Sequence, residues 1–306
     1  MSHIELFREA SRVYAAGGNV SRHFKDRGLS REEQIAIIEF AYDLQSGSYT
    51  AALRGDQGVR DQKRAWGGVV AERLARYGAR SLVEAGVGEA TTLKSIVEQV
   101  PADAEAAGFD LCVSRLVYAR EVLAETGRPV RLFTGDLSSI PLVDNAYDAL
   151  LTNHSIEPNG GRERQILAEM LRATRRLLVL VEPDYERGSA GQRQRMDELG
   201  YIKNLPAHIE ALGAKVLEYT PWQLNPNPLN AASLIVAEKP RAANWNEPVG
   251  LALASPYSKG ALVDRGGFLF SASDNLAFPV IDGFPCLLPA NAIVASHLNP
   301  AIRKRL

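Results

Sequence analysis

The stretch SLVEAGVGEATTL, residues 81–93, decides the fold of this chain. An apolar run ends in an acid, Glu84, and is followed by Gly86, Gly88 and a segment compatible with a helix. A strand that turns into a helix in this way places backbone N–H groups and the positive helix end beside a ligand. Glycine lets that ligand approach the backbone where a Cβ would collide. The stretch therefore predicts a ligand-binding turn between a strand and a helix.

Short apolar runs alternate with amphipathic segments after this turn. Five runs have the character of buried strands: SLVEAG, AEAAGFD, VRLFTGD, YDALLTN and RLLVLVEP. Helices are predicted between and after them, near residues 89–99, 113–126, 162–174 and 190–212. Such alternation favours a parallel sheet covered by helices on both faces. KVLEYTPW and ASLIVAEK, joined by the loop QLNPNPLNA, are expected to pair antiparallel at the sheet's edge. The prediction is an α/β, doubly wound sheet of seven strands, Rossmann-like in its arrangement.

The two ends of the chain depart from this pattern. Ser30 and Glu33 form a capping box before a helix, and a second helix is expected at about 61–77. KPRAANWNEP, residues 239–248, contains two prolines and predicts a linker before a segment with short β-like runs. We expect three parts: a helical lid or N-terminal extension (1–78), a central domain (79–240) and a small β-rich domain (249–298).

Composition limits the class of protein. Hydrophobic residues make up 46% of the chain and charged residues 23%, as in soluble globular proteins. The 35 basic and 36 acidic residues nearly cancel, so the overall charge does not favour nucleic acid as a partner. The two cysteines suggest no disulfide framework, and the chain shows neither a secretory signal nor a membrane-spanning segment. We therefore expect a cytoplasmic protein with a small-molecule substrate. Composition does not decide between a monomer and a homodimer.

Three further residues indicate which class of ligand the turn binds. Thr91 stands where a dinucleotide fingerprint would have its third glycine, which disfavours a nicotinamide dehydrogenase. Asp110 ends the second predicted strand 24 residues after Gly86, where a carboxylate can accept ribose hydroxyls. Glu84 would crowd a pyrophosphate but suits a cationic ligand.

Four motifs in order carry a family resemblance. EAGVG at 84–88, FD at 109–110, GDLSSIP at 135–141 and YDALLTN at 147–153 resemble those of class I S-adenosylmethionine (SAM)-dependent methyltransferases. The match is strongest to the branch with the quinone-biosynthesis enzymes and covers about residues 78–240. The resemblance implies SAM as cofactor and assigns its contacts as follows: Glu84, Gly86 and Gly88 to the methionine part and the turn, Asp110 to the ribose, Asp136 and Leu137 to the adenine, and Asn153 to the methionine moiety and the transferred methyl group. An ordinary set of turns in another doubly wound enzyme is the alternative.

The C-terminal segment resembles the small zinc-ribbon-like activator proteins that pair with tRNA and protein methyltransferases. It shares their frame P-x-x-K-G-x-L … P-x-x-D-G-x-P-x-L-L, beginning at Pro256 and ending at Leu288. The cysteines of metal-binding members are lost: Ser255, Tyr257 or Ser258, Ser271 and Asp274 stand in their region. We therefore predict no metal. The segment either covers or stabilises the catalytic domain, or shapes its substrate entrance, or it is a packing module without a role in chemistry.

Methyl transfer to a hydroxyl requires an aligned acceptor and a base that removes its proton. The base is expected near the ends of the fourth and fifth predicted strands, so His154 and Glu182 are the catalytic candidates. Candidates for binding the substrate are Tyr42, Tyr49, Glu157, Asn159, Tyr185 and Asn225, with Asn227 beside them. Tyr42, Gln45 and Tyr49 share one helical face if the helix persists through Gly47. Each of these residues also has a purely structural interpretation, as packing or loop shaping.

The polar candidates favour a methyltransferase that acts on an oxygen of a small polar or carbohydrate-like metabolite, in a biosynthetic role. A tRNA or protein methyltransferase is the alternative that the C-terminal resemblance suggests. A catalytically inactive SAM-binding partner of another protein is the third.

Overall fold

A computed structural model describes residues 2–25, 27–224, 227–240, 252–299 and 302. The predicted linker at 239–248 and the predicted contact residue Asn225 lie largely or wholly outside these residues.

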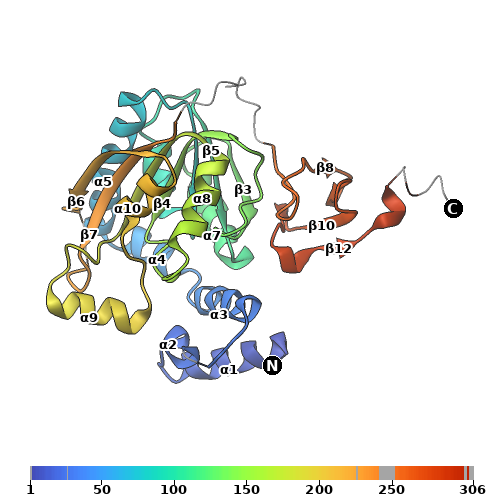
Figure 1. Ribbon diagram of the computed structural model, residues 1–306, viewed down its shortest axis with the longest axis horizontal. Coiled ribbons are helices and arrows are strands. Elements are labelled where there is room, and N and C mark those ends of the chain that lie inside the picture. Colours follow the sequence, from blue (N-terminus) through green and yellow to red (C-terminus); the bar gives the residue numbers. More distant parts are fainter. Residues whose placement is uncertain (1, 26, 225–226, 241–251, 300–301, 303–306) are drawn as a thin grey trace.

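A mixed sheet of seven strands forms the centre of the molecule (Figure 1). Its strands are β1 (Ser81–Ala85), β2 (Glu105–Asp110), β3 (Val130–Thr134), β4 (Tyr147–Asn153), β5 (Thr174–Pro183), β6 (Lys215–Pro221) and β7 (Ala232–Glu238). Their order is β3-β2-β1-β4-β5-β7-β6, and β7 runs antiparallel to both of its neighbours. The predicted seven-stranded Rossmann-like sheet with a terminal hairpin is confirmed.

Helices cover both faces of this sheet. One face packs against α5 (Gln57–Arg76), α6 (Thr91–Val97) and α7 (Val113–Ala124), the other against α8 (Glu163–Ala173) and α10 (Leu205–Ala211). Successive residues of β1 point to opposite faces of the sheet. Leu82 packs in the core on the side of α5, α6 and α7, and Val83 packs in the core on the side of α8 and α10. The helical stretch predicted at 190–212 is two helices, because α9 (Ala190–Leu199) ends at Gly200 with φ +68°. Among the described residues, no helix combines the length and apolar character that crossing a bilayer requires.

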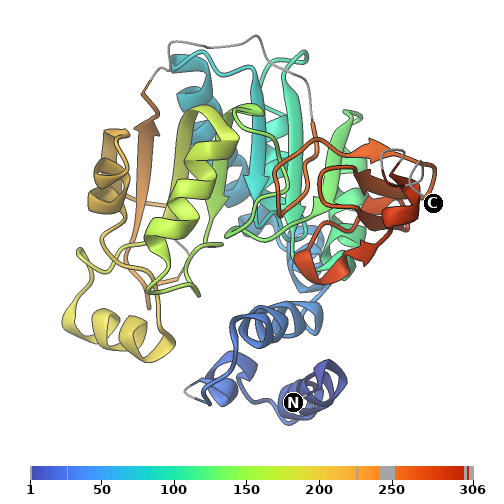
Figure 2. The ribbon, with the colours of Figure 1, turned by 45° about the vertical axis from the view of Figure 1, so that its right-hand side comes forward.

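Four N-terminal helices precede α5 and lie beside one end of the sheet (Figures 1 and 2). They are α1 (His3–Ala15), α2 (Val20–Phe24), α3 (Arg31–Asp43) and α4 (Ser48–Gly55). The first three share a small apolar core, and the predicted capping box of Ser30 and Glu33 begins α3. The helix does not persist through Gly47, the condition for a shared helical face of Tyr42, Gln45 and Tyr49, since α3 ends at Asp43. Gly47, at φ +93°, turns the chain before α4.

The C-terminal segment forms a small antiparallel sheet beside β3 (Figure 2). It consists of β8 (Val263–Asp264), β9 (Phe268–Ser271), β10 (Leu276–Ile281), β11 (Phe284–Pro285) and β12 (Ile293–Val294), with short 3-10 helices at Pro289–Asn291 and Ser296–Leu298. Cys286 bridges Thr134 in parallel, and the Leu287 amide donates to the Thr134 hydroxyl at 2.8 Å. Lys259 forms an ion pair with Glu169 of α8 at 2.9 Å. The segment thereby covers the β3 edge of the main sheet, which would otherwise present unpaired backbone groups.

Two serine hydroxyls and a carboxylate meet between two loops of the C-terminal sheet. The hydroxyls of Ser258 and Ser271 donate to Asp274 Oδ2 at 2.6 and 2.7 Å. These hydrogen bonds join two loops of the C-terminal sheet directly.

Gly67 lies where α5 packs against α6, and its replacement tests how closely the two helices pack. A Cβ on Gly67 would lie 2.4 Å from the carbonyl oxygen of Ser95, a backbone atom that cannot move away easily. Gly67→Ala is therefore expected to lower the free energy of unfolding by about 1–3 kcal/mol. Gly191→Ala in α9 is the control, because its Cβ meets open space and alanine favours a helix. Urea unfolding checks the pair; equal stabilities would contradict the close packing.

Candidate functional site

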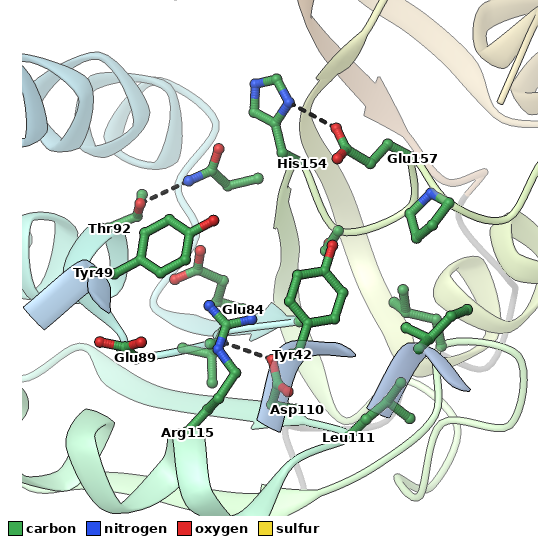
Figure 3. Close-up of a pocket in the computed structure, with 18 of the residues that line it drawn as sticks. Tyr42, Tyr49, Glu84, Glu89, Thr92, Asp110, Leu111, Arg115, His154 and Glu157 are labelled. Atoms are coloured by element: carbon green, nitrogen blue, oxygen red, sulfur yellow. Dashed lines mark hydrogen bonds and ion pairs between the residues drawn. The ribbon is translucent and has the colours of Figure 1, made fainter. Parts of the chain in front are cut away.

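A cavity of about 440 Å³ opens where the strands β1, β2 and β4 end. It lies at the point where the strand order reverses, between β1 and β4, which is where open α/β sheets bind ligands. The α3–α4 segment contributes Tyr42 and Tyr49 to its wall, and the loop after β4 contributes His154 and Glu157 (Figure 3).

The turn after β1 requires its glycines. Gly86 and Gly88 have φ of +71° and +56°. A Cβ would stand 2.3 Å from the side chain of Ser155 at the first position and 2.5 Å from the guanidinium of Arg115 at the second. Asp110 holds this turn in place: its Oδ2 accepts the Gly88 amide at 2.8 Å. Its Oδ1 accepts the Cys112 amide at 3.1 Å.

Opposite charges meet at the end of β1. Glu84 is buried and lines the cavity, and its Oε2 has no hydrogen-bond partner within the described residues. Lys63, from α5, lines the same wall and donates to the Thr92 hydroxyl at 2.7 Å. Burial raises the pKa of Glu84, although the charge of Lys63 opposes this shift. Burial lowers the pKa of Lys63, with Glu84 opposing it. A ligand carrying both an ammonium and a carboxylate would satisfy both groups.

Two sets of contacts, hydrogen bonds to Glu89 and cation–π contacts with Arg115, hold the N-terminal helices against the cavity. Glu89, in the glycine turn, accepts the amides of Gly47 and Thr50 at 2.9 and 2.6 Å, and so caps the N-terminus of α4. Tyr42 and Tyr49 place their rings 5.0 and 5.1 Å from the guanidinium carbon of Arg115. Figure 3 shows both rings above the Arg115 and Asp110 side chains.

His154 and Glu157 form a pair at the other end of the cavity. Nδ1 of His154 lies 3.1 Å from Glu157 Oε2. A carboxylate only accepts, so Nδ1 carries a proton and Nε2 is left as the acceptor of the neutral ring. Burial lowers the pKa of His154, but the hydrogen bond and the charge of Glu157 outweigh it, so the pKa is raised. Tyr201 donates to Glu157 Oε1 at 3.3 Å and fixes the carboxylate from its other side.

The structure brings most of the predicted site residues to this cavity. They are Tyr42, Tyr49, Glu84, Gly86, Gly88, Asp110, Asp136, Leu137, Asn153, His154, Glu157 and Asn159, with Asn227 beside them. Asp136 already accepts from the backbone and hydroxyl of Ser138, at 2.9 and 2.6 Å. Asn153 donates to the Thr92 hydroxyl at 2.7 Å, and its buried Oδ1 has no partner in the described part of the chain.

Two candidates do not line the cavity. Glu182 is buried beneath the loop after β4, where its Oε1 accepts the amides of Ser155 and Ile156 at 3.0 and 3.2 Å. Burial raises its pKa to about 7. It therefore positions the loop that carries His154. Tyr185 lies away from the cavity and donates to Asp197 at 3.0 Å.

Several lining residues are not among the site residues predicted from the sequence. They are Lys63, Trp66, Glu89, Thr92, Arg115, Arg195, Tyr201 and Asn230. Glu89 and Thr92 lie within the predicted turn, whereas the others stand on helices or in loops without a recognisable motif, where a single sequence does not distinguish them from surface residues.

Comparisons with known proteins place the fold. Residues 82–176 match a family model described as a methyltransferase domain. The chain is similar in structure to magnesium protoporphyrin IX methyltransferase from Synechocystis PCC 6803, solved with bound SAH: the TM-score is 0.53 at 13% identity, over 67% of this chain and 99% of that one. The mitomycin 7-O-methyltransferase MmcR gives a TM-score of 0.50 at 14% identity, over 78% of this chain and 67% of that one. A comparison with curated proteins found no match.

Proposed function

We propose that this chain, which carries a class I SAM-dependent methyltransferase domain, methylates an oxygen atom of a small polar metabolite. The observation that carries the proposal is the His154–Glu157 pair, which lies in the same cavity as the glycine turn and Asp110. A neutral histidine held by a carboxylate is the arrangement that a base for hydroxyl groups requires.

The cavity residues fit SAM, the cofactor of this enzyme class. In this proposal Asp110 accepts both ribose hydroxyls, since each of its oxygens keeps a lone pair beyond the backbone contacts. Glu84 receives the ammonium of the methionine part and Lys63 its carboxylate, which pairs the buried Glu84 Oε2. Leu137 and Asp136 border the adenine, and Asn153 lies beside the methionine moiety.

Methyl transfer itself needs little from the protein beyond alignment and proton removal. SAM held by these residues would supply an electrophilic methyl group for transfer to an oxygen of the acceptor. His154 Nε2 accepts the proton of the acceptor hydroxyl, while Glu157 stabilises the resulting imidazolium. Glu182 holds the loop that carries His154 in place by accepting two backbone hydrogen bonds from it. Tyr42 and Tyr49 cover the cavity and limit the entry of water.

The polar lining supports a small hydroxylated acceptor. Asn159, Asn227 and Tyr201 line the same cavity as His154, with amide and hydroxyl groups that can bind acceptor hydroxyls. The whole cavity of about 440 Å³ has to hold both SAM and the acceptor, which leaves room for a small acceptor only. The tRNA and protein alternatives depend on the C-terminal resemblance alone.

Titration calorimetry with SAM and, in parallel, NAD tests the first half of the proposal. Saturable binding of SAM and none of NAD is expected. Transfer of labelled methyl from SAM to a panel of hydroxylated metabolites, with amine analogues as controls, tests the second half. Binding of NAD alone, or transfer only to amines, would overturn the proposal.

A further inference from the structure

We infer that the acceptor carries an anionic group, a carboxylate or a phosphate, which Arg195 binds. This inference rests on the proposed function and adds a substrate class to it. Arg195 stands on α9 and lines the cavity, and it lies against Tyr201, the residue that donates a hydrogen bond to Glu157.

Arg195 differs from the other basic side chains of the cavity in what surrounds it. Lys63 lies in the field of Glu84, and Arg115 in the field of Asp110. His154 is hydrogen-bonded to Glu157. Within the ranges that the structure describes, Arg195 has no carboxylate within ion-pair distance. Its guanidinium donates a hydrogen bond to the side-chain oxygen of Asn230, a neutral acceptor.

The acidic residues that follow Arg195 on α9, Asp197 and Glu198, form their ion pairs with other residues. Asp197 forms an ion pair with Lys203 at 2.5 Å and accepts from Tyr185. Glu198 faces Arg22 at 3.7 Å. The positive charge of Arg195 is therefore left for the cavity.

Neighbouring groups hold the guanidinium in a defined place. Its central carbon lies 5.8 Å from the centre of the Tyr201 ring, and Asn230 holds one of its nitrogens. Tyr201 in turn donates to Glu157, the partner of His154. A chain of contacts thus links the proposed base to the guanidinium. An acceptor with its hydroxyl at His154 would present its distal end to Arg195.

Arginine is suited to that distal end because its planar fork donates two parallel hydrogen bonds to a carboxylate or phosphate. Glu157 occupies the same end but is already engaged by His154 and Tyr201. The geometry therefore favours an acceptor with a hydroxyl at one end and an anion at the other.

The test compares matched anionic and neutral probes on protein saturated with the product SAH. Glucose 6-phosphate and glucuronate are measured against glucose, and 4-hydroxybenzoate against 4-hydroxybenzamide, by titration calorimetry. At least one anionic probe is expected to bind about 10- to 100-fold more tightly than its neutral counterpart. Preference for the phosphate or for the carboxylates identifies which anion the site takes.

Arg195→Gln is expected to abolish this preference without changing the affinity for SAH. Arg195→Lys should retain part of it, since the charge stays but the fork is lost. Arg193→Gln removes the same charge from the same helix outside the cavity lining and should leave the preference intact. Equal binding of the paired probes, no anionic binding by the wild type, or a preserved preference in Arg195→Gln would each overturn the inference. Anion binding without methyl transfer would instead contradict the proposed function and leave the anion site standing.

Discussion

Asp110→Ala is expected to lower the affinity for SAM by at least about 100-fold. The carboxylate of Asp110 holds the glycine turn through the amides of Gly88 and Cys112, and in our proposal it also accepts the ribose hydroxyls. Hydrogen bonds to a charged acceptor contribute about 1.5–3 kcal/mol each, and every 1.4 kcal/mol corresponds to about tenfold in affinity. Titration calorimetry with SAM measures the loss.

Two controls separate binding from folding. Asp103→Ala removes an exposed carboxylate that precedes the same strand and pairs only with an exposed arginine in the described structure, so it should not change the affinity. Asp110→Asn preserves the shape of the side chain and should fold, while losing most of the affinity because the charge is gone. An Asp110→Ala protein that is folded and binds SAM normally would remove Asp110 from the cofactor site.

His154→Gln is expected to lower kcat for methyl transfer by about 10²–10⁴-fold while the affinity for SAM changes little. That range is the contribution that a positioned general base makes. The cofactor contacts proposed for Glu84, Lys63 and Asp110 do not involve the imidazole. His297→Gln, in the exposed C-terminal segment, is the control and should retain full activity. Unchanged kcat in His154→Gln would show that another group takes the proton.

The pH dependence of kcat/KM gives a second test of the same pair. The neutral form of His154 is the active one, so the rate should rise with pH through the pKa of this histidine. Glu157 raises that pKa by favouring the charged ring, against the effect of burial. Glu157→Gln keeps an oxygen acceptor for Nδ1 but removes the charge, so the acid limb of the profile should move to lower pH. An acid limb that stays in place would mean that the titrating group is not His154.

The sequence by itself determined the sheet and the places where its strands end. Buried strands and amphipathic helices leave local patterns, and the antiparallel hairpin at the end is marked by a connecting loop without a helical pattern. Because parallel strands present their carboxyl ends at one edge, residues such as Glu84, Asp110 and Asn153 could be expected to lie together. The glycines of the turn belong to the same local information, since glycine itself tolerates the positive φ that Gly86 and Gly88 adopt.

Only the tertiary structure decided which helical side chains complete the site. A lysine on a helix is ordinarily solvated; packing of α5 against the sheet buries Lys63 beside Glu84. Gly47 turns the chain between α3 and α4, and Arg115 still brings Tyr42 and Tyr49 together from two helices. Glu182, one of the two expected catalytic groups, lies under the loop because the side chains of a strand alternate between directions. Arg195 reaches the cavity from a helix far along the chain. Contacts of this kind depend on how distant segments pack, and residue spacing along the chain carries no record of them.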